Sequence, residues 1–303
     1  MSLIVVGNVT EDIIFRLPRL PQLGETVIAS ERLSDIGGKG LNQAIIAARA
    51  GMQVRLVAPV GDDAAGRRAR ALIRDEPLEA LLIAKDGPTD QSIIAVAAGG
   101  ENTIISSAFA ASSLTVADVI GALGAMEVQD WLLMQGNLSR ETTLGLLRLA
   151  RAAGLRTIVN PSPIRWDYSA LLPCIDLLIL NEPELRALSQ RRDLASGIAT
   201  LIDSGVGQII VTLGARGSVF AEGDQRLDAP AQPATVVDTA GAGDTFCGTY
   251  LAALARGKTP KASLHAAAAA AAITIGRSGT WSAFPSQEQL SAILSADEEC
   301  DAG

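Results

Sequence analysis

The chain has 303 residues, of which 48% are hydrophobic and 19% charged, with a formal net charge of −8 and a pI of about 4.8. A chain of this length and hydrophobicity can bury a large core, which argues against bulk disorder. The acidic balance argues against nucleic acid as a standing partner, because nucleic-acid binding usually requires a basic face.

Short apolar runs alternate with helical patterns along the chain. Runs rich in Ile, Val and Leu predict buried strands at Leu3–Val6, Gln53–Val57, Asp130–Met134, Arg156–Val159, Leu177–Leu180 and Gln208–Thr212. Amphipathic helices are predicted between them, at Asn42–Ala50, Ala64–Ile73, Thr142–Ala153, Pro183–Ser189 and Ala195–Asp203. Two helices are predicted to close the chain, one opening near Asp244 and one through the alanine run 266–272. The alternation indicates an α/β fold with a parallel sheet covered on both faces.

Two stretches interrupt this rhythm, at about residues 12–36 and 89–108. The first contains turn residues but little helical period, and the second contains the predicted strands Ser92–Ala97 and Asn102–Ser106 around the hairpin sequence Gly99-Gly100-Glu101. Strands outside the main rhythm are typical of a lid. We therefore expect one domain over residues 1–303 with a small β lid, and a solvated tail at 296–303.

Several classes of site are excluded by residue type. The one histidine, His265, excludes zinc sites built on several histidines and leaves a Ser-His-Asp triad without a visible partner motif. Cys174, Cys247 and Cys300 are far apart and form no Cys-x-x-Cys, so no disulfide framework or iron–sulfur site is predicted. No leader is predicted at the N-terminus, and the longest uncharged apolar stretch, Leu264–Gly276, is too short to span roughly 30 Å of hydrocarbon. We expect a soluble cytoplasmic protein with no membrane partner.

The phosphate motifs that the sequence could contain fail, with one exception. A Walker loop ending at Gly257-Lys258-Thr259 would need a glycine where Ala252 stands, and a Rossmann fingerprint at Gly241-Ala242-Gly243 has Phe246 in place of its third glycine. The second failure disfavours a nicotinamide-dependent oxidoreductase. What remains is the segment from Asp238 to Phe246, with two glycines before a helix predicted over Thr245–Ala255, where a phosphate could approach bare backbone amides.

Asp244 stands at the mouth of this predicted anion pocket. A carboxylate beside a phosphate site is unfavourable unless it has a task, and one such task is to act as general base for an incoming hydroxyl. The alternative is that Asp244 only caps the helix, which aspartate does well. The spacing alone leaves both interpretations open.

Two segments resemble the signatures of the PfkB carbohydrate kinases, also called the ribokinase family. They are Asp238–Asp244 with Phe246, and Gly37-Gly38-Lys39-Gly40-Leu41-Asn42-Gln43-Ala44, and the similarity extends from Gly7 to about Phe284. The resemblance implies a three-layer ribokinase-like sandwich with a mainly parallel central sheet and a small β lid. It also implies an ATP-dependent kinase that phosphorylates a sugar hydroxyl in the presence of Mg²⁺.

The resemblance assigns catalytic and sugar-binding roles. Asp244 matches the family's catalytic base, and Ala240 to Gly243, including Gly241 and Ala242, match the anion hole for the transferring phosphoryl group. Matching sugar-binding positions are Asp12, Gly38, Lys39 and Asn42. Without the resemblance, the Lys39 segment would be an ordinary helix start and Asp12 an ordinary loop aspartate.

The resemblance also assigns nucleotide and cation positions. Asn181 matches a residue near the nucleotide phosphates and Glu184 a residue that organises Mg²⁺ through water, although the pair equally fits a helix capping box. Thr212, Gly214 and Gly217 match the loop beside the ATP phosphates and ribose, for which a plain glycine turn is the alternative. Ala268 aligns with positions that lie against the adenine base. A monovalent-cation (K⁺) site is implied at Asp238, with backbone around Ala240, Thr274, Arg277 and Gly279.

Two departures from the family pattern bear on the sugar. Thr10 stands where ribokinase-like members have Asn, and Asn137 stands where they have a sugar-contacting Glu, which replaces an acceptor by a group that also donates. A ribose-like pentose is the favoured acceptor. The alternatives are fructose or another hexose, a keto-sugar acid or a nucleoside, and, from a different class, a non-catalytic sensor on the same fold.

The exposed lid strands predict a homodimer.

Overall fold

The structure is a computed structural model that describes residues 1–99, 101–124 and 126–296. Gly100 of the predicted hairpin, Cys300 and the tail from residue 297 lie outside the described residues. Among the residues described, no helix combines the length and apolarity that crossing a membrane requires.

The central sheet has nine strands in the order β13-β12-β11-β10-β9-β8-β1-β4-β5. Their bounds are β1 Leu3–Val6, β4 Val54–Gly61, β5 Glu79–Lys85, β8 Trp131–Gln135, β9 Arg156–Asn160, β10 Leu177–Asn181, β11 Gln208–Thr212, β12 Ser218–Glu222 and β13 Gln225–Ala229. Pairing is parallel from β5 to β11, and only β12 and β13 add antiparallel edges. The six strands predicted from apolar runs are all present, and the mainly parallel sheet is confirmed.

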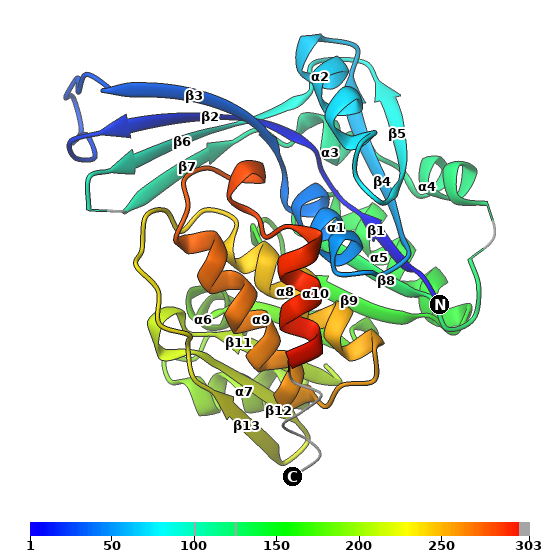
Figure 1. The fold of residues 1–303 in the computed structure, drawn as a ribbon. Helices are drawn as coiled ribbons and strands as arrows, with labels where there is room; N and C mark the ends of the chain where they lie inside the picture. The colour runs from blue at the N-terminus through cyan, green and yellow to red at the C-terminus, as the bar shows by residue number, and fades with distance from the viewer. Residues whose placement is uncertain (100, 125, 297–303) are drawn as a thin grey trace.

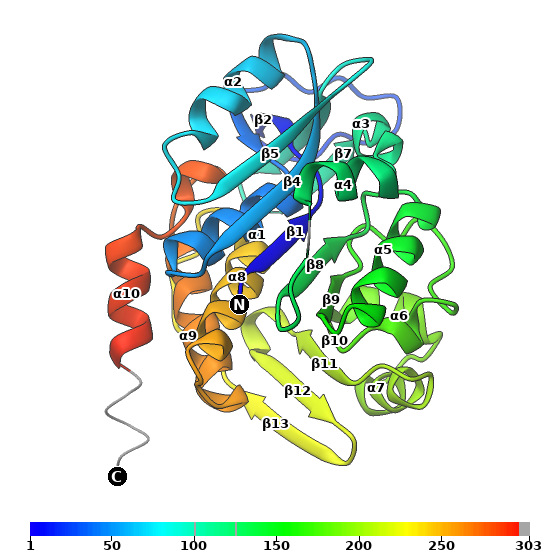
Figure 2. The same ribbon diagram turned by 90° about the vertical axis from the view of Figure 1, so that its right-hand side faces the viewer.

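Helices cover both faces of this sheet (Figure 2). One layer contains α1 Lys39–Arg49, α2 Ala64–Ile73, α8 Ala242–Ala255, α9 Pro260–Ile275 and α10 Gln287–Ala296. The other contains α3 Phe109–Ser113, α4 Val116–Leu123, α5 Arg140–Ala152, α6 Glu182–Ser189 and α7 Leu194–Asp203. The three-layer expectation is confirmed. The expectation of two closing helices is wrong, because α10 follows α9 and buries Leu290 and Leu294 in the same core.

Small residues bring α8 into direct contact with α1. A Cβ on Gly248 of α8 would lie 2.8 Å from Ile46 of α1, so a larger residue there would push the two helices apart. Eight consecutive residues of α8, from Thr245 to Ala252, are buried among α1, α9 and the sheet. This close packing places the first turn of α8 beside the first turn of α1, where the candidate site lies.

A second sheet of four strands projects from the main body (Figure 1), in the order β3-β2-β6-β7. The strands are β2 Thr10–Leu17, β3 Glu31–Gly37, β6 Asp90–Ala97 and β7 Asn102–Ser106. They correspond to the two predicted lid segments, at about residues 12–36 and 89–108. Only β2 and β6 pair in parallel. Successive side chains of β2 point to opposite faces of this sheet. Asp12 and Ile14 are buried on one face, and Ile13 and Phe15 lie on the other.

Candidate active site

Asp244 is the third residue of α8 and is 6% exposed. Its Oδ2 accepts a hydrogen bond of 2.9 Å from Asn42 Nδ2, and its Oδ1 accepts one of 2.8 Å from Gln43 Nε2, so both oxygens are held from α1. The helix begins at Ala242, three residues earlier than predicted, and its N-cap is Gly241 with no side-chain capping bond. The interpretation of Asp244 as only a helix cap is therefore wrong.

Gln43 was not assigned a role from the sequence. Its side chain is fully buried, accepts a 2.9 Å hydrogen bond from Gln135 Nε2, and also lies 3.4 Å from Asn160 Oδ1. Asn160 in turn donates to Ile179 O at 2.7 Å. Asn42 and Gln43 are two adjacent polar residues in the buried stretch of α1, and this was the signal that could have identified the network, because buried amides usually have hydrogen-bond partners.

Glycines fix where α1 begins. Gly38, the N-cap, has φ +107°, and a Cβ there would lie 2.7 Å from Asn8 O. A Cβ on Gly40 would lie 2.7 Å from Gly7 Cα, so the start of α1 rests directly on the turn after β1. Lys39 is the first residue of α1 and is half-buried. Asn42 is then one turn inside the helix, facing Asp244.

Asp12 is a buried carboxylate on β2, 4% exposed. Its Oδ1 accepts a 2.7 Å hydrogen bond from Thr10 Oγ1. Burial away from water raises the pKa of Asp12 from 3.8 to about 6, against the lowering effect of the Thr10 and Ser92 hydroxyls; the nearby charges of Asp35 and Asp244 raise it further. The hydroxyl partners of Asp12 are neutral, so its ionised form has no cationic partner among the described residues and could accept further hydroxyl donors from a ligand.

Asn137, after β8, is 5% exposed, and its side-chain Oδ1 has no protein donor. Its backbone carbonyl accepts a 2.8 Å hydrogen bond from Arg165 Nη1. The preceding Gly136 leaves no room for a side chain, because a Cβ would lie 2.0 Å from Pro163 O. The loop 161–165 therefore fixes the backbone of Asn137, while an unpaired buried acceptor remains available for a ligand.

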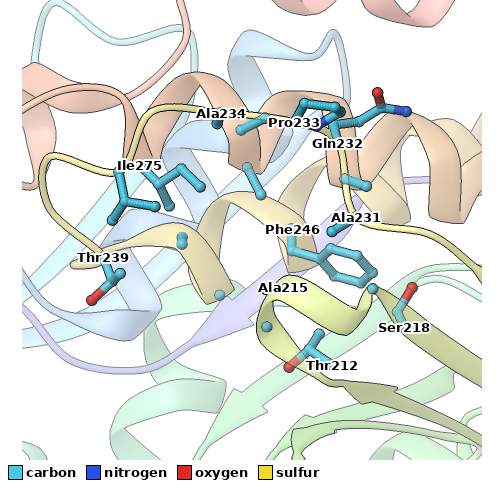
Figure 3. Close-up of a pocket in the computed structure, with 18 residues that line it drawn as sticks. Thr212, Ala215, Ser218, Ala231, Gln232, Pro233, Ala234, Thr239, Phe246 and Ile275 are labelled. Atoms are coloured by element: carbon cyan, nitrogen blue, oxygen red, sulfur yellow. The ribbon is translucent and has the colours of Figure 1, made fainter.

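A cavity of ≈ 720 Å³ lies between the loops after β11 and β13 and the helices α8 and α9 (Figure 3). It brings together the predicted nucleotide residues Thr212, Gly214, Gly217 and Ala268. Its walls are mostly small and apolar, with the Phe246 side chain from α8 labelled at its centre in the view. This shape suits a planar base and its ribose better than a polar sugar alone.

The same cavity reaches the first turn of α8. Thr239, Ala242 and Gly243 line it, and a Cβ on Gly243 would meet nothing within 4 Å. The first N–H groups of a helix lack intrahelical acceptors and carry the positive end of the helix dipole, so this end of the cavity favours an anion. The lid reaches the same loop, because Asn102 Nδ2 donates to Thr239 Oγ1 at 3.2 Å.

Asn181 and Glu184 form the capping box that the sequence offered as an alternative. Asn181 Oδ1 accepts from Glu184 N at 2.8 Å, and Glu184 Oε2 accepts from Asn181 N at 3.0 Å. Neither residue lines the cavity. No group of three or more His, Cys, Asp or Glu among the described residues is arranged to hold a metal ion. Glu184 nevertheless offers a carboxylate of the oxygen type that suits a hydrated Mg²⁺.

Asp238 is 1% exposed and is held by backbone amides. Its Oδ1 accepts from Ala240 N at 2.9 Å and its Oδ2 from Gly279 N at 3.3 Å. Thr274 and Arg277 are expected to contribute backbone groups, and their side chains bond elsewhere: the Thr274 hydroxyl pairs with that of Thr245 at 2.9 Å, and Arg277 donates to Phe284 O at 3.2 Å. A buried carboxylate with only neutral partners fits a bound monovalent cation.

Comparison with known proteins decides the family. Residues 1–287 match the description "pfkB family carbohydrate kinase". The chain belongs to the PfkB family of carbohydrate kinases. The ribokinase of Bacillus subtilis is 29% identical over 97% of this chain and 99% of its own length, and the deoxyribokinase of Salmonella typhi is 28% identical over 98% and 100%. The Arabidopsis thaliana ribokinase complexed with ribose and ATP matches at a TM-score of 0.80 and 28% identity, over 97% of this chain and 98% of that one.

This PfkB kinase is thus an ATP-dependent phosphotransferase that acts on a sugar hydroxyl, and its ribokinase-like fold is the one expected. The geometry unites most of the predicted site residues. Asp244 and Asn42 are in contact, and Asp238, Ala240 and Gly279 are linked by hydrogen bonds. Four of the five predicted nucleotide residues share one cavity with Ala242 and Gly243, and the fifth, Asn181, does not line it.

Proposed function

We propose that this PfkB kinase phosphorylates a free ribose-like pentose, with Asp244 as the general base. The observation that carries the proposal is the position of the Asp244 carboxylate. It is buried, held at both oxygens by α1 amides, and directly follows Gly243, which lines the end of the nucleotide cavity with bare backbone. A base that can reach a hydroxyl while its neighbours stabilise a phosphoryl group is what this transfer requires.

In the proposed reaction the sugar hydroxyl gives its proton to Asp244 and its oxygen attacks the γ-phosphorus of ATP in line, with ADP leaving. The backbone N–H groups of Gly241, Ala242 and Gly243 would stabilise the charge on the transferring group. The Asn42 and Gln43 amides hold the two oxygens of the carboxylate and so orient it. Phosphoryl transfer depends mainly on such positioning and charge stabilisation.

The proposed sugar-binding residues come from both sheets. Asp12 on the lid offers a carboxylate that accepts hydroxyl protons, and Asn137 offers its unpaired Oδ1. Lys39 and Asn42 on α1 supply donors, and Gly38 lets the backbone approach the ring. Lid strands β2 and β6 would close over the sugar and exclude water.

On the nucleotide side we propose that the base lies against Ala268 and that the loop Thr212–Gly217 faces the ribose and phosphates. Mg²⁺, when bound, would supply positive charge that offsets the charge of the phosphates, and Glu184 is the residue that would hold it through water. Asn181 would lie near the phosphates. K⁺ would lie at Asp238, with backbone groups near Ala240, Thr274, Arg277 and Gly279. The buried carboxylate of Asp238 supports this assignment.

The acceptor is tested by a panel of ribose, 2-deoxyribose, fructose, a keto-sugar acid and nucleosides with ATP and Mg²⁺. Similar identity to a ribokinase and a deoxyribokinase supports a pentose. The Thr10 hydroxyl donates a 2.7 Å hydrogen bond to Asp12. A sugar would therefore meet a hydroxyl at this position, where ribokinase-like members have the amide of Asn. Ribose should have the highest kcat/KM. A nucleoside preferred over every free sugar would replace the pentose by that acceptor, and binding without turnover would favour a sensor.

We also propose a homodimer formed through the lid, with a second copy of this chain as the partner and the cytoplasm, where ATP is supplied, as the site of action. The lid face opposite Asp12 carries Ile93 and Ile105, which are 43% and 68% exposed and lie opposite one another on β6 and β7. Exposed neighbouring isoleucines on a sheet face are unfavourable in water and favour burial against a partner.

A further inference from the structure

Thr280 lies between the lid and the end of α9. It is 3% exposed, and its Oγ1 lies 3.5 Å from Asp12 Oδ2 and 3.4 Å from Asp35 Oδ2. Asp12 and Asp35 are opposite one another on β2 and β3. A threonine hydroxyl has one proton, so it can serve only one of these two carboxylates fully at a time. Both contacts are long, which leaves them room to tighten when the strands move.

The residue before Thr280 contacts the other side of the site. Gly279 N donates to Asp238 Oδ2 at 3.3 Å, and the second oxygen of Asp238 accepts from Ala240 N at 2.9 Å. Ala240 directly precedes Gly241, the N-cap of α8. Two consecutive residues therefore connect the sugar-side carboxylates of the lid with the carboxylate that holds the start of the anion hole.

Residues on both sides of Gly279 are held against the lid. Gly279 has φ +97°, a conformation that side chains rarely adopt, and a Cβ there would lie 2.7 Å from Ser282 Oγ. Thr280 itself is buried, and the segment is tied to β2 a second time by a hydrogen bond from the Arg16 guanidinium to Ser278 Oγ. Figure 1 shows this segment, just before α10, below the base of β2 and β3. Because Ser278 and Thr280 both contact lid strands, we expect a displacement of these strands to move Gly279 with them.

We propose that Thr280 is a positioning residue that couples sugar binding to the anion hole, an inference that rests on the proposed sugar-binding role of Asp12. A sugar that donates hydroxyl protons to Asp12 frees the Thr280 hydroxyl to bond Asp35. Lid closure shortens that contact, and the shift passes through Gly279 to Asp238 and the Ala240 amide. Sugar and nucleotide then bind cooperatively, because each stabilises the same arrangement of this segment.

The test compares Thr280→Val, which keeps the shape and removes the hydroxyl, with Thr280→Ser, which keeps the hydroxyl. Ribose affinity is measured by titration calorimetry with and without a non-hydrolysable ATP analogue and Mg²⁺. For the unmodified enzyme the analogue should tighten ribose binding by about 5–150-fold. In Thr280→Val the analogue should tighten ribose binding by less than about twofold. The affinity of this variant for the analogue alone should also change by less than about twofold. Thr280→Ser should restore most of the coupling.

A matched control is Thr143→Val. Thr143 is also buried and donates to Ser139 O at 2.8 Å on α5, so it loses a comparable bond away from both ligands. It should lower the unfolding temperature and leave the coupling unchanged. Coupling of normal size in Thr280→Val, or no coupling in the unmodified enzyme, would overturn the inference. If Thr280→Val does not fold, Thr280→Ala replaces it as the variant without a hydroxyl. It should then lose the coupling between ribose and analogue binding that Thr280→Ser retains. If the unmodified enzyme phosphorylates none of the panel, the proposed function itself has failed.

Discussion

Gln43 Nε2 and Asp244 Oδ1 are 2.8 Å apart although 201 positions separate them in the chain. The contact is possible because α1 and α8 pack closely over Gly248, and because glycines at 38 and 40 fix where α1 begins. Gln43 therefore helps to hold the proposed base, Asp244.

We expect Gln43→Met to lower kcat by about 10–100-fold, because a hydrogen bond to a buried charged group is worth roughly 1.5–3 kcal/mol. KM for ATP should change little, since Gln43 does not line the nucleotide cavity. Steady-state kinetics measure both. Gln135→Met is the matched control: Gln135 donates to Gln43 and not to Asp244, and its loss should cost less than about fivefold. Equal effects of the two variants would contradict the direct role of Gln43.

Gly243→Ala should separate stability from activity. Its helical backbone accepts alanine and a Cβ meets nothing within 4 Å, so the variant should be as stable as the parent or more stable by about 0.5–1 kcal/mol. The added methyl group nevertheless enters the cavity where the phosphates are proposed to bind. We expect kcat/KM for ATP to fall by at least about tenfold, because a displacement of about 1 Å can lower the rate by roughly 10²-fold. Gly121→Ala on α4, also open at Cβ, controls for the helix effect and should keep full activity. Undiminished turnover in Gly243→Ala would place the polyphosphate elsewhere.

The raised pKa of Asp12 predicts a pH dependence of stability. In the folded protein Asp12 keeps its proton up to about pH 6, whereas in the unfolded chain it loses the proton near pH 3.8. The free energy of unfolding therefore falls as the pH rises from about 3.8 through 6, because the fold must then bury an ionised carboxylate. Asp12→Asn should therefore raise the free energy of unfolding at pH 8 by at most about 3 kcal/mol and have little effect at pH 3.5. Urea unfolding at both pH values measures this difference.

The same variant should lose sugar affinity, since an amide cannot accept as a carboxylate does. The affinity of the unmodified enzyme for ribose should also fall below about pH 6, where Asp12 becomes protonated. Calorimetric titration across pH 5–8 tests this. A flat profile, or Asp12→Asn with unchanged ribose affinity, would remove Asp12 from the sugar site.

Ile105→Lys should convert the proposed dimer into a monomer. A lysine on the lid face that carries Ile93 would place a charge in the buried interface. Sedimentation velocity at micromolar concentration measures the change. Ile120→Lys on α4, where the isoleucine is 41% exposed, is the control and should leave the dimer intact. A parent protein that is monomeric at every concentration would contradict the lid interface.

Local patterns predicted much of the fold because the signals are local. Ala64–Ile73 matches its predicted bounds, since Asp63 caps the helix by accepting from Gly66 N at 2.7 Å. The edge strand β5, Glu79–Lys85, was missed: its residues are mostly half-buried and give no uninterrupted buried pattern. The start of α8 was placed too late, because Gly243 reads as a helix breaker although its open surroundings let the helix pass through it.

The site was less accessible to sequence reasoning because its contacts are long-range. The sequence resemblance assigned Asp244, Asn42 and Asp12, but gave no sign that Gln43 shares the hold on Asp244 or that Thr280 touches Asp12. These contacts depend on how α1, α8 and the lid are packed. For Asn181 and Glu184 a local pattern was enough, and their capping box forms as the spacing indicates.

The most direct measurement is phosphate transfer itself. Purified enzyme with ribose, ATP and Mg²⁺ should produce a ribose phosphate, identified by mass spectrometry and ³¹P NMR, together with an equal amount of ADP. Asp244→Asn should still bind ATP but form the product about 10²–10⁴ times more slowly. Near-normal turnover in Asp244→Asn, or ATP bound without any sugar in the panel being phosphorylated, would contradict the account.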